Sequence, residues 1–152
     1  MTRAYVGLGA NLGDRERTLR AAVDALVDED GIEVVAVSAL RETDPVGVGE
    51  QPRYLNGAVA LETTVSARDL LDRLLAVEQR FGRVRVPGEH APRTLDLDLL
   101  LYGDGEIDEP GLTVPHPRLH ERRFVLEPLA ELDPGLVIPG RGGVESLLAG
   151  VH

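Results

Sequence analysis

Residues 93–102 read RTLDLDLLLY, and this stretch decides which kind of structure the chain builds around its acidic residues. In a helix, Asp96 and Asp98 would lie roughly 200° apart and the leucines would surround the axis. In a strand, successive side chains alternate between two faces. Both aspartates then share one face, and the other face carries Leu95, Leu97, Leu99 and Leu101. The strand therefore predicts an apolar core face and, opposite it, two carboxylates whose Cα atoms lie about 7 Å apart.

The segments upstream of this strand alternate between strand and helix patterns. Three runs are apolar or β-branched, as is typical of strands: residues 4–9, 32–40 and 54–62. Two stretches repeat apolar residues at helical spacing, with Asp14 and Ser66 as candidate N-caps and Gly31 as the stop of the first. With residues 95–102 as a fourth strand, the order is β-α-β-β-α-β. This order predicts an α+β, ferredoxin-like fold with a mostly antiparallel sheet and both helices on one face.

The rest of the chain supplies loops and an added layer. Residues 43–53 and 82–93 are rich in proline and glycine and read as long irregular loops, which in small domains are often functional. Residues 107–152 read as short turns and C-terminal helices packed on the sheet. We therefore expect a single domain over residues 1–152.

Composition excludes several function classes. The 152 residues include no cysteine and no lysine, so disulfides, thiolate metal sites, a Walker A lysine and a Schiff-base lysine are ruled out. A net charge of −10 argues against general nucleic-acid binding, which depends on neutralising phosphates. No apolar run approaches the ~18 residues of a membrane span, and no signal peptide opens the chain. We expect a cytoplasmic protein without nucleic-acid or membrane partners.

The carboxylate pair and a nearby arginine cluster together indicate phosphate chemistry. Two carboxylates on one face are the hard oxygen ligands that Mg²⁺ prefers, with waters and phosphates completing its shell. Residues 80–93, just before them, contain one acid, Glu89, and the arginines Arg80, Arg83, Arg85 and Arg93. Guanidinium groups would neutralise the remaining oxygens of a metal-bound polyphosphate. The alternatives are a solvated strand face for the aspartates and ordinary salt bridges for the arginines.

Four other features have both a functional and a structural interpretation. His116, between two prolines, is a candidate for a directed contact or a structural loop residue. Tyr54, near Asn56, is a candidate for stacking on a flat heterocycle or a core aromatic. Glu78 lies on an apolar helix stripe, where a carboxylate needs a partner, and we interpret it as structural or supporting the site. Glycines at positions 7, 9 and 13 depart from the dinucleotide-binding spacing and predict a tight strand-to-helix turn.

These residues resemble the 6-hydroxymethyl-7,8-dihydropterin pyrophosphokinase family of folate biosynthesis over nearly the whole chain. The matching motifs are GANLGD (9–14), QP (51–52), YLN (54–56), GRVR (82–85), PRTLDLD (92–98), VPHP (114–117) and Arg122 with FVL (124–126). The stretch 92–98 is the most specific of them. The resemblance implies an elaborated ferredoxin-like fold and an enzyme that transfers pyrophosphate from ATP to the pterin hydroxymethyl group, releasing AMP.

The resemblance also implies a role for each matching residue. The residues expected to be catalytic are Arg83, Arg93, Asp96 and Asp98, of which Asp96 and Asp98 would hold two Mg²⁺ ions. The residues expected to bind ATP are Arg85, Leu112, Thr113, His116 and Arg122. The residues expected to bind the pterin are Thr43, Pro45, Val46, Tyr54, Asn56, His90 and Phe124. Family members commonly carry tryptophan where this chain has His90, and a histidine ring offers less stacking area.

Two other functions remain open from the sequence. A ferredoxin-like module that binds a small molecule without catalysis would need no acid pair beside arginines. A Mg²⁺-dependent nucleotidyl transferase would use the same acids but release pyrophosphate rather than AMP. We expect a monomer, with a weak dimer as the alternative.

Overall fold

A computed structural model of the chain describes residues 1–11, 14–43, 54–81 and 95–151. The elements as far as the last long strand are β1 (Thr2–Ala10), α1 (Arg15–Val27), β2 (Ile32–Val37), β3 (Arg41–Thr43), β4 (Tyr54–Thr63), α2 (Ala67–Arg80) and β5 (Asp96–Tyr102). The elements that follow are β6 (Ile107–Glu109), β7 (Leu112–Val114), the 3₁₀ turn η1 (Leu119–Glu121), α3 (Arg123–Leu132), β8 (Val137–Ile138), β9 (Gly142–Gly143) and α4 (Val144–Ala149). No helix among the described residues is both long enough and apolar enough to cross a bilayer.

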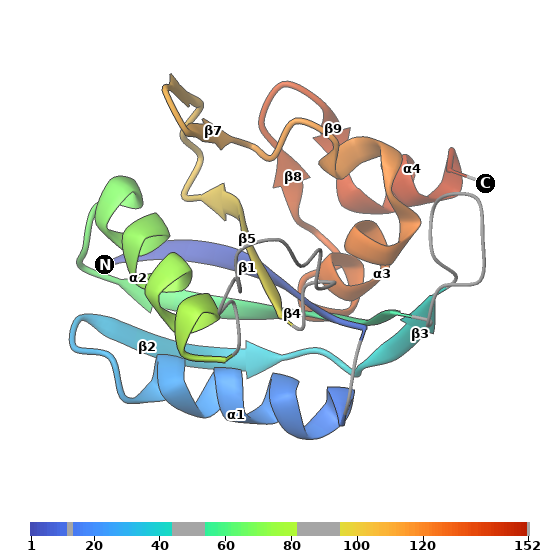
Figure 1. The fold of residues 1–152 in the computed structure, drawn as a ribbon. Helices are drawn as coiled ribbons and strands as arrows, with labels where there is room; N and C mark the ends of the chain where they lie inside the picture. Colours follow the sequence, from blue (N-terminus) through green and yellow to red (C-terminus); the bar gives the residue numbers. More distant parts are fainter. Residues whose placement is uncertain (12–13, 44–53, 82–94, 152) are drawn as a thin grey trace.

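The central sheet has the strand order β2-β4-β1-β5, with every neighbouring pair antiparallel and β3 continuing beside β4. Because β4 lies between β1 and β2, the first βαβ unit is split, as the ferredoxin-like fold requires. The predicted order and fold class are confirmed. Figure 1 shows α1 and α2 on one side of the sheet and α3 and α4 on the other.

Each face of the sheet has its own hydrophobic cluster. The first cluster joins β1, β4 and β5 to α1 and α2, with Leu26, Leu70 and Leu74 fully buried. The second joins the opposite face to the C-terminal layer, with Leu126 and Leu129 fully buried. The expected added layer over residues 107–152 is present for the part after β7, whereas Leu112 and Val114 of β7 belong to the first cluster.

Both predicted helix caps are present. The Asp14 side chain accepts a hydrogen bond from the Arg17 N–H at 3.2 Å, and the Ser66 Oγ accepts one from the Asp69 N–H at 3.1 Å. These bonds satisfy donors that the first helical turn leaves without a partner. The first helix ends at Val27, however, and not at Gly31 as predicted.

The structure corrects the expected strand over residues 32–40. The strand β2 ends at Val37 after a register shift between Val34 and Ala36, and β3 begins at residue 41, where no strand was predicted. Beyond β2, the Ser38 Oγ accepts the hydrogen bond of the Ala58 N–H at 2.9 Å. The Ser38 hydroxyl thus takes the place of the backbone carbonyl that would continue the strand pairing. Hydrophobic patterns do not indicate such a side-chain bond.

The alternation in β5 also breaks where the sequence predicted that it would continue. The register pairs Leu99 with Val6 and Leu101 with Tyr5, so Leu100 has no partner in β1 and forms a bulge. A bulge places two residues opposite one and shifts the side chains that follow. Leu100 and Leu101 therefore both join the second cluster, and the prediction that Leu101 shares the core face of Leu97 is wrong.

Residues 107–114 and 137–143 form two short hairpins, β6–β7 and β8–β9, where the sequence predicted only turns and helices. Strands of two or three residues are too short to show alternation. Gly111, with φ of 77°, occupies the turn between β6 and β7, a conformation that a side chain would strain.

Candidate active site

The two aspartates lie on the strand at the edge of the sheet. Asp98 is exposed and Asp96 is half-buried, whereas Leu97 between them is 3% exposed and belongs to the core. The alternation predicted for this part of the strand is therefore present. It directs both carboxylates to the face on which the C-terminal layer packs.

Two glycines of β1 lie directly beside this pair. Gly9 pairs with Asp96 and Gly7 pairs with Asp98. A Cβ on Gly9 would lie 3.0 Å from the Asn56 Oδ1 and would press on that amide, so glycine favours this close approach. For Gly7 and Gly9 the predicted strand-to-helix turn is wrong, because both lie within β1 and line a cavity. Gly13, the third glycine of that prediction, lies outside the described residues.

The first cavity, which we call the Asp96 cavity, has a volume of about 540 Å³. The predicted site residues that line it are Thr43, Tyr54, Asn56, Asp96, Asp98, Arg122 and Phe124. They come from β3, β4, β5 and the start of α3, and they include two of the five aromatic residues of the chain. The structure therefore brings four of the seven predicted pterin contacts, Thr43, Tyr54, Asn56 and Phe124, together with the carboxylate pair.

Polar and cationic contacts organise the walls of the Asp96 cavity. The buried Asn56 Nδ2 donates a hydrogen bond to the Thr43 Oγ1, which joins β4 to β3. The Arg122 guanidinium lies 5.5 Å from the centroid of the Phe124 ring, within cation–π range. The cavity thus combines aromatic surfaces, an anchored amide and a positive charge.

The second cavity, which we call the Thr113 cavity, has a volume of about 370 Å³ and lies between α2, β5 and β7. It is lined by Glu78, Leu97, Asp98, Leu99, Leu112, Thr113 and His116, with Leu71, Leu75, Gly111 and Pro117. Asp98 lines both cavities. The carboxylate of Asp98 therefore lies between the two cavities.

Two hydrogen bonds fix His116, and one of them joins it to the strand of the aspartates. Its backbone N–H donates to the Leu100 carbonyl at 3.0 Å, and its ring Nδ1 accepts from the backbone N–H of Arg118 at 3.3 Å. Burial lowers the pKa of His116 below its usual value of 6.5, the Asp98 carboxylate opposes this shift, and the Arg122 and Arg118 charges reinforce it. With Nδ1 as an acceptor, the neutral ring carries its proton on Nε2 and can donate one hydrogen bond.

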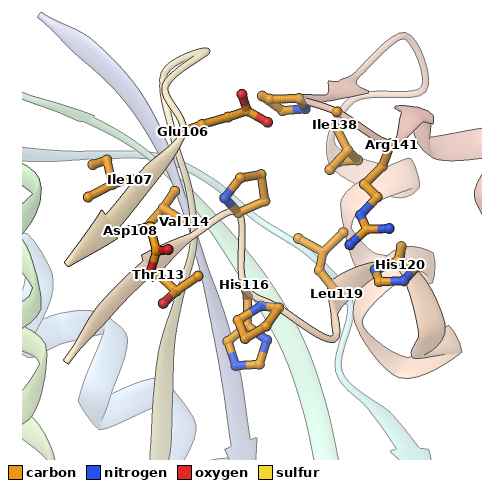
Figure 2. A pocket seen from close by; sticks show the side chains of 14 residues that line it. Glu106, Ile107, Asp108, Thr113, Val114, His116, Leu119, His120, Ile138 and Arg141 are labelled. Carbon is orange, nitrogen blue, oxygen red and sulfur yellow. The ribbon is translucent and has the colours of Figure 1, made fainter. Parts of the chain in front are cut away.

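A third cavity, of about 400 Å³, lies beside the Thr113 cavity and shares Thr113, His116 and Pro117 with it. Figure 2 shows Asp108 and Thr113 of the β6–β7 hairpin on one side of this cavity and Arg141 and His120 on the other. Its lining includes neither Asp96 nor Asp98. It therefore adjoins the candidate active site without containing the carboxylates.

The structure separates some residues that the sequence grouped. Arg122, predicted to bind ATP, lines the Asp96 cavity with Phe124 and not the Thr113 cavity. Six predicted site residues lie outside the described part of the chain: Pro45, Val46, Arg83, Arg85, His90 and Arg93. Their roles stay predictions.

Sequence reasoning also missed residues that line the site. Gly7 and Gly9 could have been found as alternate glycines on one face of a strand pattern. Glu78 was noticed only as a carboxylate on an apolar stripe. The pair Arg118 and Glu121, 3.5 Å apart at the Asp96 cavity, carried no pattern that distinguishes it from surface charge.

The donor set at Asp96 and Asp98 suits a hard divalent cation. Among the described residues there is no group of three histidine, cysteine, aspartate or glutamate side chains that could enclose a metal ion. Two carboxylates on one face of a strand leave most coordination positions to water and ligand oxygens, as Mg²⁺ prefers. The site therefore fits a metal that is bound together with a phosphate ligand.

The fold and this arrangement define a class: a ferredoxin-like α+β protein with a carboxylate pair in one ligand-sized cavity, of which one member also lines a second cavity. The model of the family "7,8-dihydro-6-hydroxymethylpterin-pyrophosphokinase (HPPK)" matches residues 5–134, and the chain belongs to this family.

Individual relatives support the assignment to this family. The chain is 46% identical over 147 residues to the 2-amino-4-hydroxy-6-hydroxymethyldihydropteridine pyrophosphokinase of Pseudomonas aeruginosa, covering 97% of this chain and 90% of that protein. It is 46% identical over 129 residues to the protein of the same name from Bacillus subtilis, covering 85% and 77%.

A solved structure supports the fold. The Plasmodium falciparum HPPK-DHPS wild type with pteroate superimposes with a TM-score of 0.77 at 13% identity. The match covers 98% of this chain and 44% of the Plasmodium chain, so this chain spans less than half the length of that structural relative.

Proposed function

We propose that this chain transfers the pyrophosphoryl group of ATP to the hydroxymethyl group of 6-hydroxymethyl-7,8-dihydropterin, giving the pterin diphosphate and AMP. Membership of the family supports this reaction. The observation that carries it is that Asp98 lines both the Asp96 cavity and the Thr113 cavity. A reaction between two substrates needs a shared point at which the reacting atoms meet.

The pterin would bind in the Asp96 cavity. Tyr54 and Phe124 offer flat surfaces for a heterocycle, and Asn56 and Thr43 offer polar atoms that recognise its edge. The hydrogen bond between Asn56 and Thr43 holds the amide in place before the ligand arrives. This preorganisation lowers the entropy that binding costs.

The nucleotide would bind in the Thr113 cavity, with its phosphates directed toward Asp98. His116, with its proton on Nε2, would donate a hydrogen bond to a phosphate oxygen without needing to be charged. Arg122 would contribute positive charge from the Asp96 cavity. The predicted roles of Arg83, Arg85 and Arg93 in neutralising the phosphates belong to the same proposal.

Asp96 and Asp98 would hold Mg²⁺, two ions with ATP by the family resemblance. When bound, the metal would neutralise charge on the polyphosphate and lower the barrier to attack on phosphorus. The reaction forms a bond from the hydroxymethyl oxygen to the β-phosphorus and breaks the bond from that phosphorus to the oxygen leading to the α-phosphorus. The hydroxyl proton passes to solvent, and AMP leaves.

One chain supplies both cavities, so the proposed reaction needs no second copy, and we propose that the protein is a monomer. We also propose that it works in the cytoplasm, where ATP is available. The decisive experiment incubates the protein with Mg²⁺, ATP and hydroxymethyl-dihydropterin and identifies the nucleotide product. AMP is the expected product. ADP would indicate a simple kinase, pyrophosphate would indicate nucleotidyl transfer, and binding without turnover would indicate a non-catalytic module.

A further inference from the structure

Glu78, near the end of α2, lines the Thr113 cavity, but the proposed reaction gives its carboxylate no role. Its side chain is 4% exposed, and its Oε2 accepts a hydrogen bond from the Leu97 N–H at 2.8 Å. Leu97 is the residue between Asp96 and Asp98. A charged group is costly to bury unless it is hydrogen-bonded, and the Leu97 N–H supplies such a bond to this carboxylate.

The position of Leu97 in the sheet explains why a side chain can bind its amide. The strand β5 lies at the edge of the central sheet, with β1 on one side and no strand beyond it in the described part of the chain. Amides on an outer strand edge have no ladder partner. The Glu78 carboxylate takes this place at Leu97, and the His116 N–H does the same at the Leu100 carbonyl.

The helix that carries Glu78 is itself firmly anchored. Leu70, Leu74 and Val77 of α2 are fully buried in the first hydrophobic cluster, so the helix cannot shift without opening the core. A short charge-assisted hydrogen bond from such a helix fixes the backbone of the strand at one point. The group that is fixed is the backbone N–H of Leu97, the residue that lies between the two aspartates.

We propose that Glu78 is a positioning residue that holds the Leu97 amide and thereby sets the relative placement of the Asp96 and Asp98 carboxylates for their shared cation. The inference rests on the proposed function, because it assigns those carboxylates to a metal-bound phosphate. Groups that orient metal ligands without touching the metal typically change metal affinity or activity by about 10- to 100-fold when they are replaced.

Two substitutions separate the reach of the side chain from its charge. Glu78→Gln keeps an oxygen at the same distance from the Leu97 amide but removes the charge. Glu78→Asp keeps the charge but is one methylene shorter and does not reach. Both retain a polar side chain of similar size, so the fold is preserved, which thermal unfolding checks.

The first readout is the Mg²⁺ concentration that gives half-maximal AMP release at saturating ATP and pterin. We expect a roughly tenfold increase for Glu78→Asp and less than about a threefold change for Glu78→Gln. Saturating ATP removes any effect that arises from weaker nucleotide binding. The second readout is hydrogen exchange at the Leu97 amide, which should be faster in Glu78→Asp and unchanged in Glu78→Gln.

The opposite result, with Glu78→Gln impaired and Glu78→Asp normal, would show that charge matters and would overturn the proposal. Unchanged Mg²⁺ requirements in both variants, or an unchanged Leu97 exchange rate in Glu78→Asp, would also overturn it. If the unsubstituted protein releases no AMP, the proposed function fails instead. The positioning role is then tested by measuring the affinity for Mn²⁺ in the presence of a non-hydrolysable ATP analogue. The affinity should be weaker in Glu78→Asp and nearly unchanged in Glu78→Gln.

Discussion

Asp98 is the residue on which the proposed reaction most depends, because its exposed side chain lines both cavities to which we assign the substrates. We predict that Asp98→Asn lowers kcat by at least about 100-fold, since the amide keeps the size of the side chain but does not neutralise a cation. Its free energy of unfolding should stay within about 0.5 kcal/mol of the unsubstituted protein, as for most surface substitutions. Turnover assays and denaturant titrations measure the two quantities. A variant with normal turnover would remove the metal role from this residue.

His116 predicts a pH dependence of stability. Its pKa is lowered in the fold mainly by burial, so the unfolded chain binds a proton more readily than the folded one. Its contribution to stability is therefore complete above the unfolded value of about 6.5 and is lost as the pH falls toward the lower folded value.

The comparison with His116→Gln isolates this contribution from all other titrating groups. We expect the unsubstituted protein to lose more stability between pH 7.5 and pH 5.5 than His116→Gln does, because glutamine does not titrate. Denaturant unfolding at the two pH values measures the difference. Equal losses would show that His116 takes up its proton equally in the folded and unfolded states.

At the scale of elements, α3 is tied to the segment that leads into β3. The Glu131 carboxylate accepts a hydrogen bond from the Ala39 N–H at 2.8 Å and pairs with the Arg41 guanidinium. The Ala39 bond is the main cause that lowers the pKa of Glu131, and Arg41 adds to it. This contribution to stability is present above the usual pKa of 4.5 and is lost as the pH falls through the lowered folded value.

This tie predicts a kinetic effect confined to one substrate. Because β3 carries Thr43 into the Asp96 cavity, Glu131→Ala should raise the KM for the pterin by about two- to fivefold, which is the range expected for an exposed ion pair. The KM for ATP should stay unchanged, because β3 contributes no residue to the Thr113 cavity. Glu127→Ala on the same helix is the matched control, since Glu127 lies farther from Arg41, at 3.8 Å.

At the scale of the whole molecule, the two cavities predict that a substitution in each of them raises the KM of one substrate only. Phe124→Leu removes an aromatic surface from the Asp96 cavity and should raise the KM for the pterin by about two- to tenfold. Thr113→Phe adds bulk at an exposed position of the Thr113 cavity and should raise the KM for ATP at least about tenfold. Each variant should leave the other KM within about twofold, and a variant that shifts both would place the substrates in one shared cavity.

The order of the four long strands and the first two helices, and the faces of β5 as far as Leu99, followed from local patterns. The alternation through Asp96, Leu97 and Asp98 depends only on neighbouring residues, as do the caps at Asp14 and Ser66, and these features agree with the structure. Patterns failed where a backbone group found a non-local partner. The bulge at Leu100 depends on pairing with β1, and the end of β2 depends on a Ser38 hydroxyl that binds Ala58.

The amino-acid sequence by itself determined the ferredoxin-like order, the acidic pair and its direction, because a side-chain period of two or 3.6 is a property of contiguous residues. Only the tertiary structure decided that Asp98 joins two cavities, that Gly9 passes beside Asn56, and that Glu78 reaches the amide of Leu97. Glu78 and Leu97 lie 19 positions apart in the sequence, and Gly9 and Asn56 lie farther apart still. Such distances are set by how the helices pack on the sheet, which no local pattern encodes.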